Sequence, residues 1–197
     1  MAGKALMWIA VLATIAVLAA PNIFAVEKDS GPPQGIAPGT VADYLRAVIM
    51  AHRHFYTIHI VNRLQQERIV ESSENWKTAH TLPLPVQLLQ ETSEIAELTG
   101  PNVRYRLISQ WPINKANAPA NEFERMALKE VQARPNRPYS STIPGSGGKV
   151  FQAVYADVAV TVACVQCHNA HPNSPKSDFK TGDVMGGLVI SFPLSTQ

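Results

Sequence analysis

Two cysteines and a histidine form the most chemically specific pattern in this chain of 197 residues. They lie in the run Cys164-Val165-Gln166-Cys167-His168, and the sequence contains no other cysteine. This C-x-x-C-H spacing is typical of covalent attachment of c-type haem. The two thiols can add to the two vinyl groups of one porphyrin, and the imidazole that follows can bind the iron. The sequence therefore predicts one covalent haem c held by Cys164 and Cys167, with His168 as the iron ligand.

The same residues are compatible with two other kinds of chemistry. A zinc site would need ligands from Cys164, Cys167, His168 and His171, but structural zinc sites usually space their two ligand pairs well apart. A C-x-x-C pair is also typical of thiol-disulfide oxidoreductases, in which it opens a helix after a strand. The two prolines within residues 169–175 argue against a long regular helix here. A plain disulfide would close a small, strained loop. Haem attachment is the first hypothesis, and a periplasmic thiol-disulfide oxidoreductase is the alternative.

The ligand on the opposite side of the iron is left open by the sequence. The candidates are three histidines, one methionine or an open position: His52, His59, His80 and Met50. A histidine on an apolar helical face is more often a hydrogen-bonded core residue than a ligand, and a methionine in a helix usually serves packing. Two further histidines are not expected to bind iron, because His54 is expected to be solvated and His171 to lie in a loop near the haem propionates.

The first 25 residues have the composition of a secretory signal peptide. Lys4 is followed by an uninterrupted apolar stretch over residues 5–20, which gives a basic start and an apolar core. Cleavage after Ala25 is expected, and an uncleaved anchor is the alternative because the stretch is only slightly shorter than a membrane-spanning helix. Residues 26–39 are rich in Gly and Pro and are predicted to be a linker. We therefore expect an exported bacterial protein of the periplasm, attached to a membrane only if this segment is uncleaved.

The remaining chain, residues 40–197, is long enough to bury a core and is expected to form a single domain. Its helical part covers residues 40–100 and its sheet part covers residues 101–197. The net charge is only +2, and neither Lys nor Arg forms a dense run. Nucleic acid is therefore not an expected partner.

Three helices are predicted from apolar periodicity and capping residues. The first covers residues 41–70, with Thr40 as its N-cap, and the second covers residues 86–98. The third begins after Asn121, because Glu124 lies at the position that completes a capping box. On the first helix His52 and His59 are seven residues apart, so they share one face with three apolar residues: Leu45, Val48 and Phe55.

Four strands are predicted in the second half of the domain, and residues 135–148 are expected to be irregular. Gly186 and Gly187 in the last strand are expected to mark a bulge or a place where the backbone passes close to the porphyrin. Helices followed by strand, helix and three strands predict an α+β fold with an antiparallel sheet. The predicted strands cover residues 103–109, 150–155, 158–162 and 184–192, the middle two as a hairpin.

With these segments the chain resembles a family of exported, single-haem c-type proteins with a PAS-like fold. The resemblance covers about residues 39–194 and is carried by four stretches: residues 82–85, 108–124, 164–168 and 182–188. It implies a PAS-like antiparallel sheet with an N-terminal helical extension and a covalently attached haem. It also implies that Cys164 and Cys167 are the thioether positions and that His168 is the proximal ligand. Members occur as sensory domains of chemoreceptors and kinases and as free-standing proteins. Because the chain ends at Gln197, soon after the last strand, a free-standing cytochrome is favoured.

The function expected from these features depends on the sixth iron ligand. Two strong protein ligands favour electron transfer to small redox partner proteins, whereas an open position favours redox or gas sensing with NO or CO. An enzyme such as a peroxidase is less expected, because the sequence offers no recognisable set of distal acid-base groups. The predicted helix over residues 41–70 is long enough to pair with a second copy, so a homodimer remains open.

Overall fold

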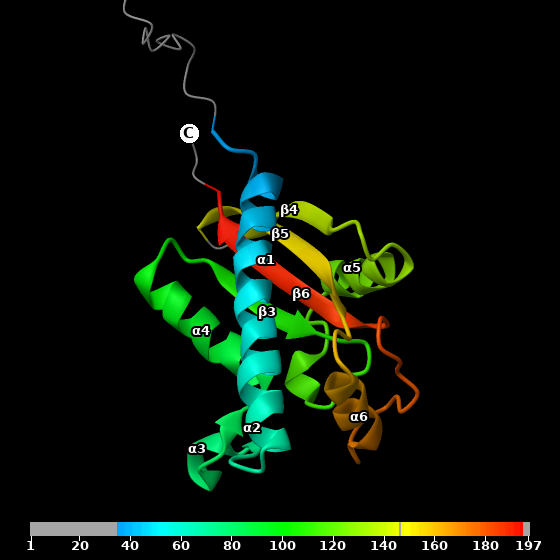
Figure 1. Ribbon diagram of the computed structural model, residues 1–197. Helices are drawn as coiled ribbons and strands as arrows, with labels where there is room; N and C mark the ends of the chain where they lie inside the picture. Colours follow the sequence, from blue (N-terminus) through cyan, green and yellow to red (C-terminus); the bar gives the residue numbers. More distant parts are fainter. Residues whose placement is uncertain (1–34, 146, 195–197) are drawn as a thin grey trace, which may run out of the picture. The chain divides into compact units, whose positions relative to one another are not determined.

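The computed structural model describes residues 35–145 and 147–194 (Figure 1). The predicted signal peptide and most of the predicted linker lie outside the described residues. Among the helices in the described residues, none is long and apolar enough to cross a membrane.

The chain alternates between helical and strand segments and contains one four-stranded sheet of order β3-β6-β5-β4. Every neighbouring pair in this sheet is antiparallel, which confirms the predicted α+β fold. A second, minimal sheet consists of the parallel pair β1 and β2. The elements are α1 (Pro38–Phe55), the π-helix η1 (Tyr56–Asn62), α2 (Arg63–Gln66), β1 (Ser72–Ser73), α3 (Trp76–Ala79), β2 (Leu82–Pro83), α4 (Pro85–Thr99), β3 (Arg104–Ile108), the 3-10 helix η2 (Lys115–Asn117), α5 (Glu122–Ala133), β4 (Tyr139–Gly145), β5 (Gly148–Val158), α6 (Val162–Ala170) and β6 (Val184–Pro193).

Helices cover both faces of the four-stranded sheet. Leu188 and Ile190 of β6 pack on the face where α1 and α4 contribute Ile49 and Leu89. Val189, between them in sequence, points to the opposite face and packs with residues of α5. Since successive side chains of a strand point to opposite faces, a strand covered on both sides is apolar almost throughout. The central strands β5 and β6 therefore form the middle of the core.

The predicted helix over residues 41–70 corresponds to the run of α1, η1 and α2. This run begins three residues earlier than predicted, at Pro38, and its N-cap is Ala37 instead of Thr40. A proline suits the first turn of a helix because its fixed φ is already helical and its missing N–H would have no partner there. The π-helix η1 interrupts the run over seven residues.

Two predictions about the strands are wrong. Residues 135–148 are not irregular, because β4 lies within them and pairs with β5 along its whole length. The predicted hairpin is instead the single strand β5, and Val162 begins helix α6. The charged residue Asp157 lies inside this strand, where its side chain is buried in an ion pair with Arg53.

The other predicted elements are confirmed with small shifts. Helix α4 and strands β3 and β6 lie where they were expected. Helix α5 begins after Asn121, whose side-chain Oδ1 accepts a hydrogen bond from the Glu124 N–H at 2.9 Å. The Glu124 carboxylate accepts from the Ala120 N–H at 2.6 Å and from Arg106 at 2.6 Å, so it reaches past the cap residue.

Candidate functional site

A cavity of about 450 Å³ lies at one end of the four-stranded sheet. Strands β3 and β5 both run antiparallel to β6, so the carboxyl ends of β3 and β5 and the start of β6 meet at the same end. Residues from these three strand ends line the cavity, together with the helical run from Arg53 onward, the loop after β3 and helix α6. The cavity is thus formed by segments that are far apart in the sequence.

Helix α6 brings the three predicted site residues to this cavity. Cys164, Cys167 and His168 all line it. The helix is capped by Thr161, whose Oγ1 accepts a hydrogen bond from the Cys164 N–H at 3.3 Å and lies 3.1 Å from the Cys164 sulfur. The helix has nine residues and ends at Ala170, before the first proline. The prolines argued against a long regular helix, and α6 is indeed short, but it follows strand β5, so its position does not argue against thiol-disulfide chemistry.

Burial controls the protonation of two of these side chains. Burial lowers the pKa of His168 below its ordinary value, which favours the neutral imidazole that metal binding requires. Burial also raises the pKa of the Cys167 thiol, with Cys164 adding to the effect. Reactive cysteines of oxidoreductases have lowered pKa values because the thiolate is the nucleophile. This shift gives no support to the thiol-disulfide alternative.

Phe179 and Asn169 hold helix α6 against the rest of the domain. The Asn169 side-chain N–H donates to the Phe179 carbonyl at 2.9 Å, and the Phe179 N–H donates to the Asn169 carbonyl oxygen at 3.0 Å. The Phe179 ring is buried and meets the His168 ring edge-on, with centroids 6.1 Å apart. It also meets Trp111 edge-on at 5.6 Å. These contacts restrict how the His168 imidazole can turn.

None of the four candidate ligands for the opposite side lines the cavity. His52, His59 and His80 are exposed, and Met50 packs against the core. The predicted face of the first helix, with Val48 and Phe55, is turned to solvent, since these residues are 56% and 60% exposed. The face that is buried first against the core and then lines the cavity carries Ala42, Ile49, Arg53, Thr57 and Val61.

His54 is not solvated, in contrast to the prediction. It is half-buried, and its Nε2 atom is buried with no hydrogen-bond partner among the described residues. Burial is the main cause that lowers the pKa of His54, and the positive charge of Arg53 lowers this pKa further. No local pattern around His54 indicates this burial.

Arg53 and Asp157 form an ion pair on the cavity wall that sequence reasoning missed. Their side chains are only 16% and 11% exposed. Burial acts to lower the pKa of Arg53, but the attraction and hydrogen bond of Asp157 outweigh it, so the pKa is raised. Two signals could have found the pair: an arginine on the core-facing side of a helix and an aspartate inside an apolar strand.

His171 also lines the cavity, as expected for a residue of the loop after α6. Its Nδ1 accepts a hydrogen bond from the Asn173 N–H at 3.1 Å. Within residues 35–145 and 147–194, no group of three or more His, Cys, Asp or Glu side chains is placed to hold a metal ion. The zinc interpretation, which needs His171 beside Cys164, Cys167 and His168, therefore has no geometric support.

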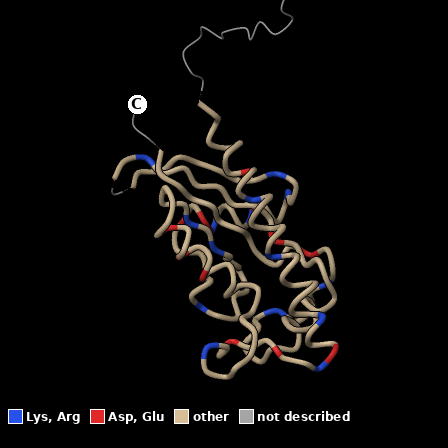
Figure 2. The backbone as a smooth tube through the Cα atoms, turned by 60° about the vertical axis from the view of Figure 1, so that its left-hand side comes forward, with Lys and Arg blue, Asp and Glu red and all other residues tan. Residues whose placement is uncertain are grey.

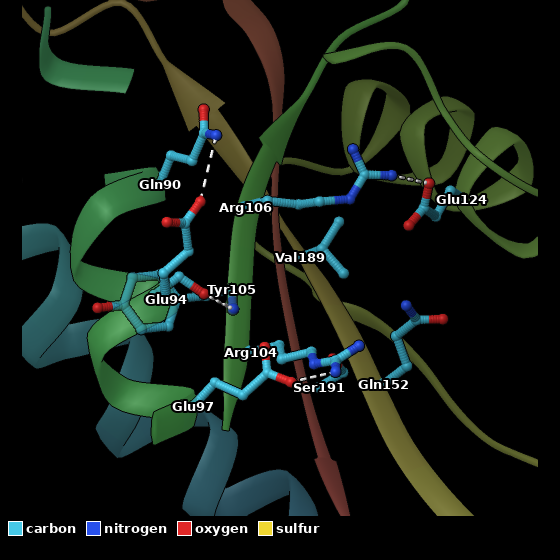
Figure 3. A pocket seen from close by; sticks show the side chains of 11 residues that line it. Gln90, Glu94, Glu97, Arg104, Tyr105, Arg106, Glu124, Gln152, Val189 and Ser191 are labelled. Atoms are coloured by element: carbon cyan, nitrogen blue, oxygen red, sulfur yellow. Dashed lines mark hydrogen bonds and ion pairs between the residues drawn. The ribbon is translucent and has the colours of Figure 1, made fainter. Parts of the chain in front are cut away.

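A second cavity of about 450 Å³ lies where α4 meets the sheet (Figure 3). Four of its five charged side chains form ion pairs, since Arg104 binds Glu97 and Arg106 donates to Glu124 at 2.6 Å, while Glu94 accepts a hydrogen bond from Gln90 at 3.4 Å. No cysteine or histidine lines it among the described residues. Of the two cavities, only the one beside α6 therefore contains the C-x-x-C-H residues.

The fold and this cavity define an α+β protein in which a C-x-x-C-H helix closes a pocket at the end of an antiparallel sheet. A family model matches residues 39–193, and the chain belongs to the Tll0287-like family. A solved structure described as that of the cyanobacterial heme-protein Tll0287 matches with a TM-score of 0.51 and 16% sequence identity. The match covers 82% of this chain and 99% of that chain, and it shows a shared fold. No curated protein sequence matches this chain.

Proposed function

We propose that this chain is an exported protein that binds one haem in the cavity beside α6. Cys164 and Cys167 form the thioether bonds, and His168 is the proximal iron ligand. The observation that carries this proposal is that all three side chains of the C-x-x-C-H motif line one cavity. Membership of the Tll0287-like family and the fold shared with a structure described as a heme-protein support the same cofactor.

The residues around the cavity fit a porphyrin in two respects. The donor set is correct, because a neutral imidazole and two thiols lie on one short helix. The cavity is also partly apolar, as a porphyrin face requires, with walls that include Leu107, Ile108 and Met185. Haem supplies an iron that can change its oxidation state and bind small ligands. The contribution of the protein is to hold the His168 ring through Phe179 and to shield it from water.

The position of the four candidate ligands favours sensing over simple electron transfer. His52, His59, His80 and Met50 lie outside the cavity lining, so none of these four residues would occupy the sixth position of the proposed haem. An iron with an open position binds diatomic gases such as NO and CO, whereas two strong protein ligands favour electron transfer. We therefore place the chain among redox or gas sensors with a PAS-like fold, active in the periplasm after removal of residues 1–25.

Haem staining of the purified exported protein after denaturing electrophoresis tests the covalent attachment. A stained band is expected for the wild type, and none for the double variant Cys164→Ser, Cys167→Ser. His168→Ala should keep the stain and alter the absorption spectrum, because the thioether bonds do not need the imidazole. A colourless wild-type band with two titratable thiols would refute the proposal.

Carbon monoxide added to the reduced protein tests the open position. The spectrum should shift in the wild type and in His52→Ala, His59→Ala and Met50→Leu alike. A low-spin spectrum that ignores the gas in the wild type, but responds in one of these variants, would identify that residue as the sixth ligand and favour electron transfer.

A further inference from the structure

Several residues of the first helical run line the cavity, and Arg53 is the charged one among them. One face of this run follows a four-residue spacing from Ile49 through Arg53 and Thr57 to Val61. Ile49 packs in the core, and the other three residues line the cavity. Whatever occupies the cavity therefore meets a guanidinium from this side.

Asp157 fixes the direction of this guanidinium. Asp157 belongs to the central strand β5 and pairs in register with Gly186 of β6, so its position is set by the sheet. It accepts a hydrogen bond from one terminal nitrogen of Arg53. The Arg53 Nε is buried and has no partner among the described residues. Because this Nε has almost no accessible surface, a ligand in the cavity does not reach it. The second terminal nitrogen of Arg53 is neither buried nor hydrogen-bonded among the described residues, so it is the donor left for a bound acceptor.

The backbone next to Arg53 is also unusual. The π-helix η1 begins three residues after it, at Tyr56, and the hydroxyl of Thr57 donates to the Arg53 carbonyl at 2.8 Å. π-Helical segments inside α-helices are rare and are frequently found at functional sites. The segment keeps Thr57 and Val61 on the same wall as Arg53.

We propose that Arg53, oriented by Asp157, selects small inorganic anions as ligands at the open position of the proposed haem iron. Its guanidinium donates a charge-assisted hydrogen bond to the bound anion, a kind of bond about twice as strong as a neutral one. Neutral diatomic gases gain much less from this contact. The inference rests on the proposed function. Glu74 also lines the cavity, but it is exposed, so solvent weakens its repulsion of an anion.

Azide and carbon monoxide serve as an anionic and a neutral probe, each titrated by absorption spectroscopy. Azide is added to the oxidised protein and carbon monoxide to the reduced protein. Arg53→Gln should weaken azide binding by about ten- to one-hundredfold, as expected for a hydrogen bond to a charged group, and change carbon monoxide binding by less than about threefold. Arg63→Gln is the matched control, since Arg63 lies on the same helical run but pairs with Glu67 in solvent.

Two further variants separate anion selection from damage to the fold. Arg53→Lys keeps the charge beside Asp157 and should retain more azide affinity than Arg53→Gln. The double variant Arg53→Met, Asp157→Asn removes the ion pair without leaving a buried charge, and should lose azide affinity as Arg53→Gln does. Haem content and thermal stability are measured for each.

Three outcomes would overturn the inference. Azide affinity could be unchanged within twofold in Arg53→Gln and in the double variant, azide and carbon monoxide could weaken equally, or the wild-type haem spectrum could fail to respond to azide. A wild type without haem stain is a different failure, since it refutes the proposed function and with it the inference.

Discussion

Asn169 holds the C-x-x-C-H helix in place through two hydrogen bonds to one backbone residue. Both the N–H and the carbonyl of Phe179 are satisfied by this amide, at 3.0 Å and 2.9 Å. An amide is the side chain that can donate and accept in this way at once. Phe179 in turn contacts the His168 ring. The orientation of the imidazole therefore depends on Asn169, although the Asn169 side chain forms no hydrogen bond with His168.

Asn169→Ala should lower the free energy of unfolding by about 2 kcal/mol, because two backbone groups of Phe179 lose their partner. Urea denaturation measures the change. Asn173→Ala is the matched control, because Asn173 is exposed in the neighbouring loop and should change stability by less than about 0.5 kcal/mol. Equal changes in unfolding free energy for the two substitutions would show that the hydrogen bonds of the Asn169 amide do not stabilise the fold.

His54 should make stability depend on pH. Burial, the charge of Arg53 and the charge of Arg46 lower its pKa, whereas Asp157 acts to raise it. The pKa of a histidine in the unfolded chain is about 6.5. When the pKa in the folded protein is lower than this, the histidine does not change the unfolding free energy at pH values well above 6.5. It reduces the unfolding free energy as the pH falls below about 6.5, because the unfolded chain then binds the proton more readily. Between pH 7.5 and pH 5.5 the wild type should therefore lose more unfolding free energy than His54→Gln. Parallel denaturant titrations at both pH values measure this, and an equal loss in both proteins would contradict it.

At the scale of elements, the start of β6 shapes the end of the sheet where the cavity lies. Asp157 pairs with Gly186, but Val158 pairs with Val184, so Met185 is left over as a bulge. The backbone of Gly186 passes so close to β3 that an added Cβ would collide with the Ile108 carbonyl oxygen. The bulge therefore lies at Met185, one residue before the glycine pair for which it was predicted, and the close approach at Gly186 is to the backbone of β3. The alternative, a close approach to the porphyrin, stays a prediction.

Gly186→Ala should destabilise the protein by about 3 kcal/mol or more, because the obstacle is backbone and has little freedom to move. Gly147→Ala, where an added Cβ meets nothing within 4 Å, should stay within about 0.5 kcal/mol of the wild type. Thermal or urea unfolding of the two variants measures the difference. A wild-type stability for Gly186→Ala would mean that β3 and β6 separate more easily at this point than the structure shows.

Over the whole molecule, acidic and basic residues are interspersed along the described backbone, with no long stretch of one sign (Figure 2). Stability is less even. The strands β5 and β6 are hydrogen-bonded on both sides and covered on both faces, whereas β1 and β2 pair over two residues each. Local opening is easiest where few buried contacts and few paired backbone groups hold a segment.

Hydrogen exchange measured by mass spectrometry should reflect this difference. Peptides from β5 and β6 should exchange far more slowly than peptides from residues 67–83, which contain β1, α3 and β2. The contrast should persist in the double variant Cys164→Ser, Cys167→Ser, because the central strands are held by the sheet and its two helical layers. Comparable protection of the two regions would contradict the layered core described above.

Local sequence determined much of this protein. Capping residues and periodicity located helices α4 and α5, and alternation located β3, because these signals act within a few residues. The spacing of the C-x-x-C-H run predicted Cys164, Cys167 and His168 as site residues for the same reason, because the motif covers only five positions. The strand β4 was missed because it is a polar edge strand with no clear apolar alternation of its own. Its pairing with β5 becomes visible only in the structure.

The tertiary structure alone decided which side of the first helix is buried. This helix has apolar residues on two faces, one with Val48 and Phe55 and one with Ile49 and Tyr56, and periodicity alone does not choose between them. The sheet packs against the face of Ala42 and Ile49, and that choice turns Arg53 to the cavity and His52 and His59 to solvent. Such a choice depends on contacts with β5 and β6, which lie about 100 and about 140 residues further along the chain. No local pattern in the helix encodes these contacts.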